Sequence, residues 1–343
     1  MNQKKESTSD WFFTNPGSAG LNPEKLSELE TLIPSQYRNI NGIVVIHKGA
    51  VAFERYFNGF RPEDTHHVAS VTKSVISALI GMAIDKGFIE SIDRSVLDFF
   101  PEYLPDPSNN MIRQITLRHL LTMTTPFLWH TGISGNEPLD RLRRQKKWVP
   151  YILSLMGRNG RLGDFQYCTA GIHVLSAILT RTTGLCAREF ANENLFRPVG
   201  MREIPDHPTQ SFGLEDIFGK KLTGWIADPE GNTVGGWGLT LTPRDMARFG
   251  TLYLNKGLWE GLQVIPEAWV RDSIVKNEAM YGYLWWLREE TDLFAFSAMG
   301  SGGNIICCIP DKEMVVAIAS GIVAKPKDRW PIITDYLIPA INE

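Results

Sequence analysis

The sequence predicts an α+β protein: one antiparallel sheet flanked by helices, with a mainly helical region inserted into it. Two observations lead to this class. Apolar, β-branched and aromatic segments of strand length gather near the two ends of the chain, at 40–57 and 285–320. Between them, from about 91 to 242, the pattern changes to short helices and long irregular connections. Strands from the two ends can pair with one another, so the ends predict one sheet and the middle an insertion.

This pattern predicts three parts. An extended, polar arm covers 1–22, a discontinuous sheet domain covers 23–90 and 243–343, and an inserted helical domain covers 91–242. The chain has 343 residues, of which 43% are hydrophobic and 21% charged, which is an ordinary globular composition. A chain of this length can bury a large core, and we expect a cleft where the two domains meet.

The first part of the sheet domain has clear local signals. A helix is predicted over Pro23–Ile33, with Asn22 as its N-cap and Pro23 at its first position. Two strand-like segments, 40–46 and 51–57, are separated by a short turn and predict a β-hairpin. An almost wholly apolar helix then begins near Ser70 and ends before Gly87, which suits the residue after a helix C-terminus.

Further elements are predicted in the middle and at the end of the chain. In the insertion we expect helices over 117–123, 151–156, 169–183 and 187–195, followed by a Gly- and Trp-rich loop over 223–238 that frames the cleft. Thr242 and Pro243 begin a strong helix that runs through Tyr253. Further elements are predicted as a helix over 266–277, strands over 285–287, 293–298, 304–309 and 314–320, and a closing helix over 331–341.

Charge and composition exclude several classes of function. The formal net charge is −3 and no basic stripe exists beyond the short run 141–147, so nucleic acid is not an expected partner. No stretch of 18 apolar residues occurs and the N-terminus has no apolar signal region, so we expect a cytoplasmic protein with no membrane partner. The four cysteines form no C-x-x-C pair, which favours free thiols.

The segment Ser70-Val71-Thr72-Lys73 carries the strongest chemical signal. Residues three apart share a helix face and helical side chains lean toward the N-terminus, so Lys73 can reach the Ser70 hydroxyl. Burial in an apolar helix disfavours the ammonium form, which would let this lysine act as a base toward the serine. A second match to S-x-x-K, Ser273 to Lys276, ends an ordinary amphipathic helix and is interpreted as chance.

Two further segments follow in a fixed order. Phe165-Gln166-Tyr167-Cys168-Thr169 precedes the helix at 169–183, and Ala298-Met299-Gly300-Ser301-Gly302-Gly303 lies between two predicted strands. This order resembles the serine β-lactamase and penicillin-binding protein superfamily, in which S-x-x-K is followed by S/Y-x-N and then by K/H-T/S-G. Over about residues 25–340 the chain looks like the class C-like branch, which includes esterases and 6-aminohexanoate-dimer hydrolases, and this implies a β-lactamase-like fold.

The resemblance also implies roles for individual residues. Ser70 would be the nucleophile, Lys73 would help to deprotonate it, and Tyr167 would share the base role and protonate the leaving group. The backbone N–H groups of Ser70 and Ser301 would form the oxyanion hole, and Gly300 would let the substrate approach the strand closely. No cofactor and no metal are implied, and the partner is a small ester or amide substrate.

Two positions depart from the family pattern. Thr169 stands where the family has Asn, and Ala298 stands where it has Lys or His. An alanine cannot bind the carboxylate that most β-lactams and cell-wall peptides present. The sequence therefore predicts hydrolysis of a small neutral ester or amide through an acyl-enzyme.

Each assignment has a structural alternative. Tyr167 could be a packed core residue, Thr169 could serve only as an N-cap, and Gly300 could belong to a plain hairpin turn. Trp129, Trp237, Trp285 and Trp286 could line an apolar acyl pocket or simply pack in the core. The histidines lack metal-ligand spacing and are expected to be structural.

Alternatives also remain for the function. The leading hypothesis is an esterase-like serine hydrolase. The others are an amidase of the 6-aminohexanoate-dimer type or a D-aminopeptidase, a β-lactamase or penicillin-binding protein, and an inactive relative that binds a ligand. The sequence leaves the oligomeric state open.

Overall fold

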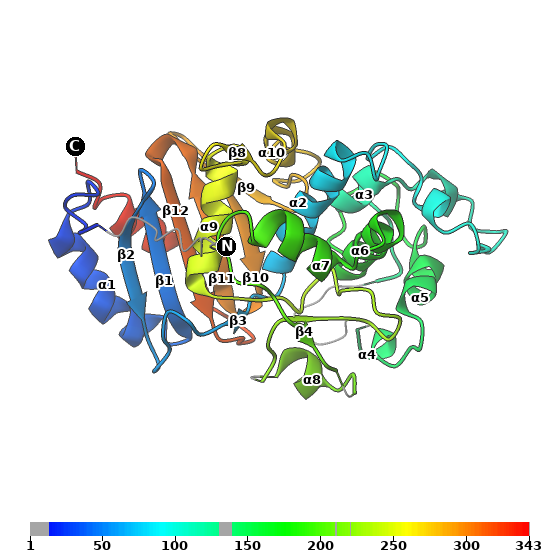
Figure 1. Ribbon diagram of the computed structural model, residues 1–343, viewed down its shortest axis with the longest axis horizontal. Coiled ribbons are helices and arrows are strands. Elements are labelled where there is room, and N and C mark those ends of the chain that lie inside the picture. The colour runs from blue at the N-terminus through cyan, green and yellow to red at the C-terminus, as the bar shows by residue number, and fades with distance from the viewer. Residues whose placement is uncertain (1–13, 130–138, 210, 220, 343) are drawn as a thin grey trace, which may run out of the picture.

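The structure is a computed structural model that describes residues 14–129, 139–209, 211–219 and 221–342. Its centre is a six-stranded antiparallel sheet in the order β2-β1-β12-β11-β10-β9 (Figure 1). Strands from the two ends of the chain meet at β1 and β12, where Val45 pairs with Val316. The predicted α+β class and the single sheet built from both chain ends are therefore confirmed.

The strands of this sheet agree closely with the predicted segments. Their bounds are β1 (Ile40–His47), β2 (Ala50–Tyr56), β9 (Trp286–Glu290), β10 (Leu293–Gly300), β11 (Asn304–Ile309) and β12 (Met314–Ser320). Short strand pairs lie outside it: β3 (His66–His67) with β6 (Thr240–Leu241), β4 (Asp206–His207) with β5 (Trp225–Ile226), and β7 (Leu258–Trp259) with β8 (Leu262–Gln263).

The helices lie on both faces of the sheet and to one side of it (Figure 1). Their bounds are α1 (Pro23–Gln36), α2 (Val71–Asp85), α3 (Leu117–Leu121), α4 (Leu139–Leu142), α5 (Trp148–Leu155), α6 (Thr169–Thr183), α7 (Ala187–Ala191), α8 (Leu214–Phe218), α9 (Pro243–Leu254), α10 (Glu267–Ser273) and α11 (Trp330–Ile332). Short 3₁₀ or π segments connect them, of which Asn192–Phe196 and Ile333–Leu337 continue α7 and α11.

Strand β12 shows why the sheet is buried on both faces. Its residues alternate between two cores. Met314, Val316 and Ile318 belong to an outer core, where they pack with α1 and the C-terminal helical segment. Val315 and Ala317 belong to an inner core, where they pack with α9 and the helical region. Successive side chains on a strand point to opposite faces, so a strand covered on both sides reads as a continuous apolar run. Helix α2 lies between the sheet and the insertion, where it contacts both β10 and α6.

Several helix ends follow the predicted caps. Asn22 Oδ1 accepts hydrogen bonds from two backbone N–H groups of α1, and Thr242 Oγ1 accepts one from Asp245 in α9. Helix α6 ends at Gly184, which adopts φ +75°. Predicted boundaries were wrong by several residues at 266–277 and at 331–341, because the helices there are shorter or change to a π segment.

The predicted arm is different from expectation where the structure describes it. Residues 1–13 lie outside the described ranges, and 14–22 form turns instead of an extended arm. Ala19 and Leu21 are buried in the outer core. All strands of the large sheet come from 23–90 and 243–343, although the division into domains stays a prediction. None of the helices in the described ranges is long and apolar enough to cross a membrane.

Candidate active site

Ser70 is the N-cap of α2 and sits at a fixed junction. The pairing of β3 with β6 and a hydrogen bond from Val68 N to Leu239 O (3.0 Å) anchor the chain just before the serine. Ala69 adopts φ +50°, a left-handed conformation that is unfavourable for a residue with a Cβ and that often occurs at active sites. The local backbone therefore turns sharply at the residue that precedes the candidate nucleophile.

Lys73 lies one turn into α2 and is only 1% exposed. Its Nζ is 2.8 Å from Ser70 Oγ and 2.7 Å from the carbonyl oxygen of Gly236. The structure thus brings the predicted serine and lysine into direct contact. The second match to S-x-x-K does not form this pair: the Ser273 hydroxyl is buried and donates to Trp269 O at 2.7 Å, and Lys276 is exposed.

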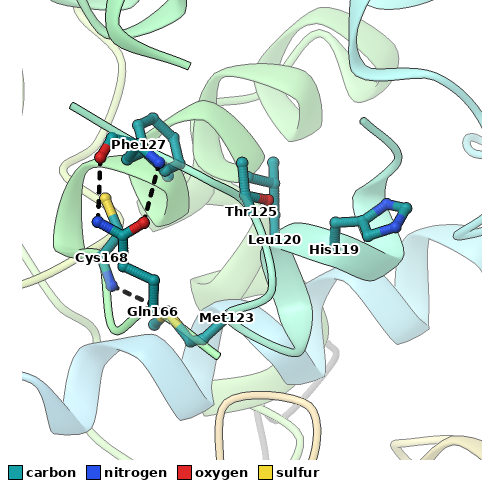
Figure 2. Close-up of a pocket in the computed structure, with 8 residues that line it drawn as sticks. His119, Leu120, Met123, Thr125, Phe127, Gln166 and Cys168 are labelled. Atoms are coloured by element: carbon teal, nitrogen blue, oxygen red, sulfur yellow. Dashed lines mark hydrogen bonds between the residues drawn. The ribbon is translucent and has the colours of Figure 1, made fainter. Parts of the chain in front are cut away.

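The segment that carries Tyr167 is held by its two neighbours. The Gln166 side chain accepts from Phe127 N (3.1 Å) and donates to Phe127 O (3.0 Å), and Cys168 N donates to Met123 Sδ at 3.3 Å (Figure 2). Gln166 also donates to Trp129 O at 2.8 Å. Backbone hydrogen bonding from Gln166 N to Met123 O (2.7 Å) adds a further anchor. These contacts fix the backbone on both sides of Tyr167.

Tyr167 itself faces the lysine. Lys73 Nζ lies 5.1 Å from the centroid of the Tyr167 ring, so the structure brings all three predicted catalytic side chains together. Of the aromatic side chains that surround this ring, the sequence indicated Trp286 as a possible pocket residue but did not indicate Tyr281. Trp286 stacks on it at 5.7 Å, and Tyr281 meets it edge-on at 6.4 Å. The two adjacent tryptophans differ in their contacts, because Trp286 stacks on Tyr167 whereas Trp285 stacks on Phe249 in the core.

The end of β10 lies against the start of α2. An added Cβ at Gly300 would be 2.2 Å from Val68 O and 3.2 Å from Ser70 N, so only glycine allows this approach. Ser301 follows directly, which places the two predicted oxyanion donors on adjoining segments. Among the described residues, none accepts a hydrogen bond from Ser70 N–H. The role of Ser70 and Ser301 as an oxyanion hole stays a prediction that this arrangement supports.

The Gly- and Trp-rich loop over 223–238 supplies the second partner of Lys73, the carbonyl oxygen of Gly236. Helix α6 holds this loop through Thr169, His173 and Ser176, which share one helix face. His173 Nε2 donates to the Asp228 carboxylate at 2.9 Å, and Ser176 Oγ donates to Thr233 O at 2.5 Å. Burial opposes ionisation of Asp228, but hydrogen bonds from His173 and Asn232 hold the pKa of its carboxyl below the ordinary value.

Gly236 provides a test of this loop. An added Cβ would lie 2.5 Å from Thr169 Cγ2 and 2.7 Å from Thr169 O, so Gly236→Ala must displace the carbonyl that accepts from Lys73. We expect the kcat of ester hydrolysis to fall by about 10-fold or more, because small misplacements at a site are costly. Gly213→Ala is the control, since Gly213 has φ −66°. Equal kcat values for the two variants would contradict the role of the Gly236 carbonyl.

The predicted substrate-binding residues are less exposed than a binding surface requires. Ala298 is 1% exposed and Trp129 0%, and both belong to the inner core. Trp237 is buried and stacks on Trp148 at 6.1 Å, which favours the core-packing alternative for both tryptophans. Thr169 is the first residue of α6 rather than its N-cap, which is Cys168. Substrate contact by these four residues and by Gly300 stays a prediction.

The nearby histidines are held in the neutral state. Burial lowers the pKa of both His66 and His67 to about 4, so neither carries a charge at neutral pH. No group of three or more His, Cys, Asp or Glu side chains within the described ranges could hold a metal ion.

Comparison with known proteins gives consistent results. The chain is 26% identical over 279 residues to the 6-aminohexanoate-dimer hydrolase of Paenarthrobacter ureafaciens, which covers 75% of this chain and 64% of that protein. The chain thus spans less than two thirds of the length of this curated relative.

Solved structures share the fold. The hydrolase EstCE1, described as having promiscuous acyltransferase activity, superposes with a TM-score of 0.73 at 16% identity, covering 96% of this chain and 99% of EstCE1. The octameric penicillin-binding protein homologue from Pyrococcus abyssi superposes with a TM-score of 0.64 at 19% identity, covering 93% and 78%. The predicted β-lactamase-like fold is confirmed. The model of the family described as "Beta-lactamase" matches residues 35–330, which is most of this chain. The chain therefore belongs to the β-lactamase family.

Proposed function

We propose that this protein is a serine hydrolase that cleaves a small ester or amide through an acyl-enzyme on Ser70, with esterase-like preference. The observation that carries the proposal is the 2.8 Å contact between Lys73 Nζ and Ser70 Oγ at a buried helix start. A serine needs an adjacent base to become a nucleophile, and Lys73 is the amine in contact with Ser70.

The contacts of Lys73 suit this role. A neutral amine has two N–H donors and one lone pair. Donation to the Gly236 carbonyl at 2.7 Å leaves the lone pair free to accept the Ser70 proton as the hydroxyl attacks the substrate carbonyl. Tyr167, beside Lys73, would protonate the leaving group, and water would then hydrolyse the acyl-enzyme by the reverse proton path.

The oxyanion would be stabilised by backbone donors. The N–H groups of Ser70 and Ser301 lie on the abutting ends of α2 and β10 and carry no charge that must be neutralised. Preorganised donors of this kind stabilise negative charge that develops in the transition state. The proposed partner is therefore a small molecule with a reactive carbonyl.

The alanine at position 298 supports a substrate without a carboxylate. A lysine there would give a charge-assisted hydrogen bond to a substrate carboxylate, which contributes about 1.5–3 kcal/mol. Since roughly 1.4 kcal/mol corresponds to a tenfold change, its absence costs about tenfold to a hundredfold in kcat/KM. We expect p-nitrophenyl butyrate to be hydrolysed with a much higher kcat/KM than nitrocefin. Comparable values for the two would favour a β-lactamase instead.

The likeness to a 6-aminohexanoate-dimer hydrolase favours one second candidate, an amidase for a linear amide. A substrate panel separates the two: p-nitrophenyl esters, 6-aminohexanoate dimer and D-aminoacyl anilides. Turnover of the dimer above that of the esters would replace the esterase assignment. Absence of turnover on every substrate, together with absence of labelling by a fluorophosphonate, would indicate an inactive relative.

A further inference from the structure

The segment that follows Gly300 contains two glycines in unusual conformations. Gly302 has φ +82° and Gly303 has φ +84°, in the left-handed region that glycine adopts easily. Such a segment has many accessible conformations on its own, yet the N–H of Ser301 can stabilise an oxyanion only when it is held in place. The structure should therefore contain side chains that fix this segment.

Asn304 fixes it from one side. This residue is 1% exposed, and its Nδ2 lies 2.8 Å from Ser301 O and 3.5 Å from His67 O. Its Oδ1 accepts from Ser320 N at 2.9 Å. One amide group thus links the Ser301 segment, the strand that leads to Ser70, and β12.

Asn39 and Arg329 fix the next carbonyl. Gly302 O accepts from Asn39 Nδ2 at 2.6 Å and from Arg329 Nη2 at 3.1 Å. The two side chains also bind each other, with Arg329 Nη2 2.8 Å from Asn39 Oδ1. An added Cβ at Gly303 would be 2.8 Å from the guanidinium, so the arginine packs directly against the glycine segment.

Burial of the charged Arg329 side chain costs free energy of folding. It is 3% exposed, and within the described parts of the chain no carboxylate lies within ion-pair distance of it. A buried cation without an anion needs compensation from hydrogen bonds. Here the compensation comes from backbone carbonyls, the Ser320 hydroxyl and the Tyr37 ring, which is 5.4 Å away.

We propose that Asn39, Asn304 and Arg329 form an oxyanion brace, a set of positioning residues that holds the Ser301 N–H toward the reacting carbonyl. The brace rests on the function proposed above. Both carbonyls that follow the Ser301 N–H point to the brace and are held there, at Ser301 O by Asn304 and at Gly302 O by Asn39 and Arg329. The brace touches no substrate and acts through Ser301.

Asn304→Ala tests the brace, with Asn192→Ala as matched control. Asn192 is also a buried asparagine that binds backbone in both directions, through Ile204 O at 2.9 Å and Ile204 N at 2.8 Å. Fluorophosphonate titration gives the concentration of active sites, and kcat and KM for p-nitrophenyl butyrate are measured per titrated site. The inhibition constant of phenylboronic acid, whose serine adduct is tetrahedral, reports binding of a transition-state mimic.

For Asn304→Ala we expect kcat per site to fall by roughly tenfold or more with little change in KM, since outright loss of an oxyanion donor costs about 10²–10³ in kcat. Boronate affinity should fall by the same factor. Asn192→Ala should lower only thermal stability. If Asn304→Ala does not fold, the half-buried Asn39 offers Asn39→Ala with the same expected split.

Equal kcat per site and equal boronate affinity in the brace variant and in Asn192→Ala would overturn the brace while leaving the wild type an active hydrolase. A wild type that neither turns over esters nor reacts with the fluorophosphonate would instead overturn the proposed function, and the brace with it. The two failures are therefore distinguished by the wild-type protein alone.

Discussion

Ser70→Ala is expected to abolish ester hydrolysis while leaving the fold intact. The acyl-enzyme needs a nucleophile, and without it only substrate binding and the oxyanion hole remain, so we expect kcat to fall by about 10³-fold or more. The measurement is p-nitrophenyl butyrate turnover, with circular dichroism to show an unchanged structure. Loss of one hydroxyl at a helix N-cap that makes no capping hydrogen bond should not unfold the protein.

Ser273→Ala is the matched control for this variant. Ser273 begins the other S-x-x-K match, but its hydroxyl donates to the backbone of its own helix, at Trp269 O. The variant should keep wild-type kcat even if its stability falls slightly. Turnover of Ser70→Ala within about tenfold of the wild type would contradict the assignment of Ser70 as nucleophile.

Lys73→Ala and Tyr167→Phe should each lower kcat by about 10²-fold or more, the usual scale for removal of a general base or acid. The two side chains are adjacent, with Lys73 Nζ 5.1 Å from the Tyr167 ring, and both would move the same protons. Their effects should therefore not add in the double variant. The measurement is a double-variant cycle on kcat, with thermal denaturation to confirm that each protein is folded.

Additive losses in that cycle would show that one residue has only a structural role. Lys73→Met separates charge from volume, because methionine is apolar and of similar length. If Lys73→Met kept the activity that Lys73→Ala loses, the lysine would matter for packing alone and not for proton transfer.

Local patterns predicted most of the fold. The apolar, β-branched segments of the hairpin, the caps at Asn22 and Thr242, and Gly184 after α6 all act within a few residues, so the sequence shows them directly. The same holds for Ser70 and Lys73, whose contact depends only on the spacing of one helix turn. Their approach to Tyr167 required the resemblance to a family, because nothing local indicates that α6 begins beside α2.

The rest depends on contacts between distant parts of the chain. The partner of Lys73 is a backbone carbonyl 163 residues away, and Arg329 binds an asparagine 290 residues earlier. Such contacts leave no periodic signal in the sequence. Burial of Ala298 was not predicted, and core packing of Trp129 was left as one of two alternatives, for a related reason: an apolar residue near a motif can face either the core or the substrate, and only the packing decides.

The central claim is that Ser70 forms a covalent acyl-enzyme, and mass spectrometry of the trapped intermediate tests it most directly. The wild type, mixed with p-nitrophenyl butyrate and quenched in acid before steady state, should gain the mass of one butyryl group. Fragmentation should place that group on Ser70, and Tyr167→Phe should retain the label if that tyrosine also serves deacylation. A butyryl group on any other residue, or turnover of the ester without a covalent adduct under any quench time, would contradict the account.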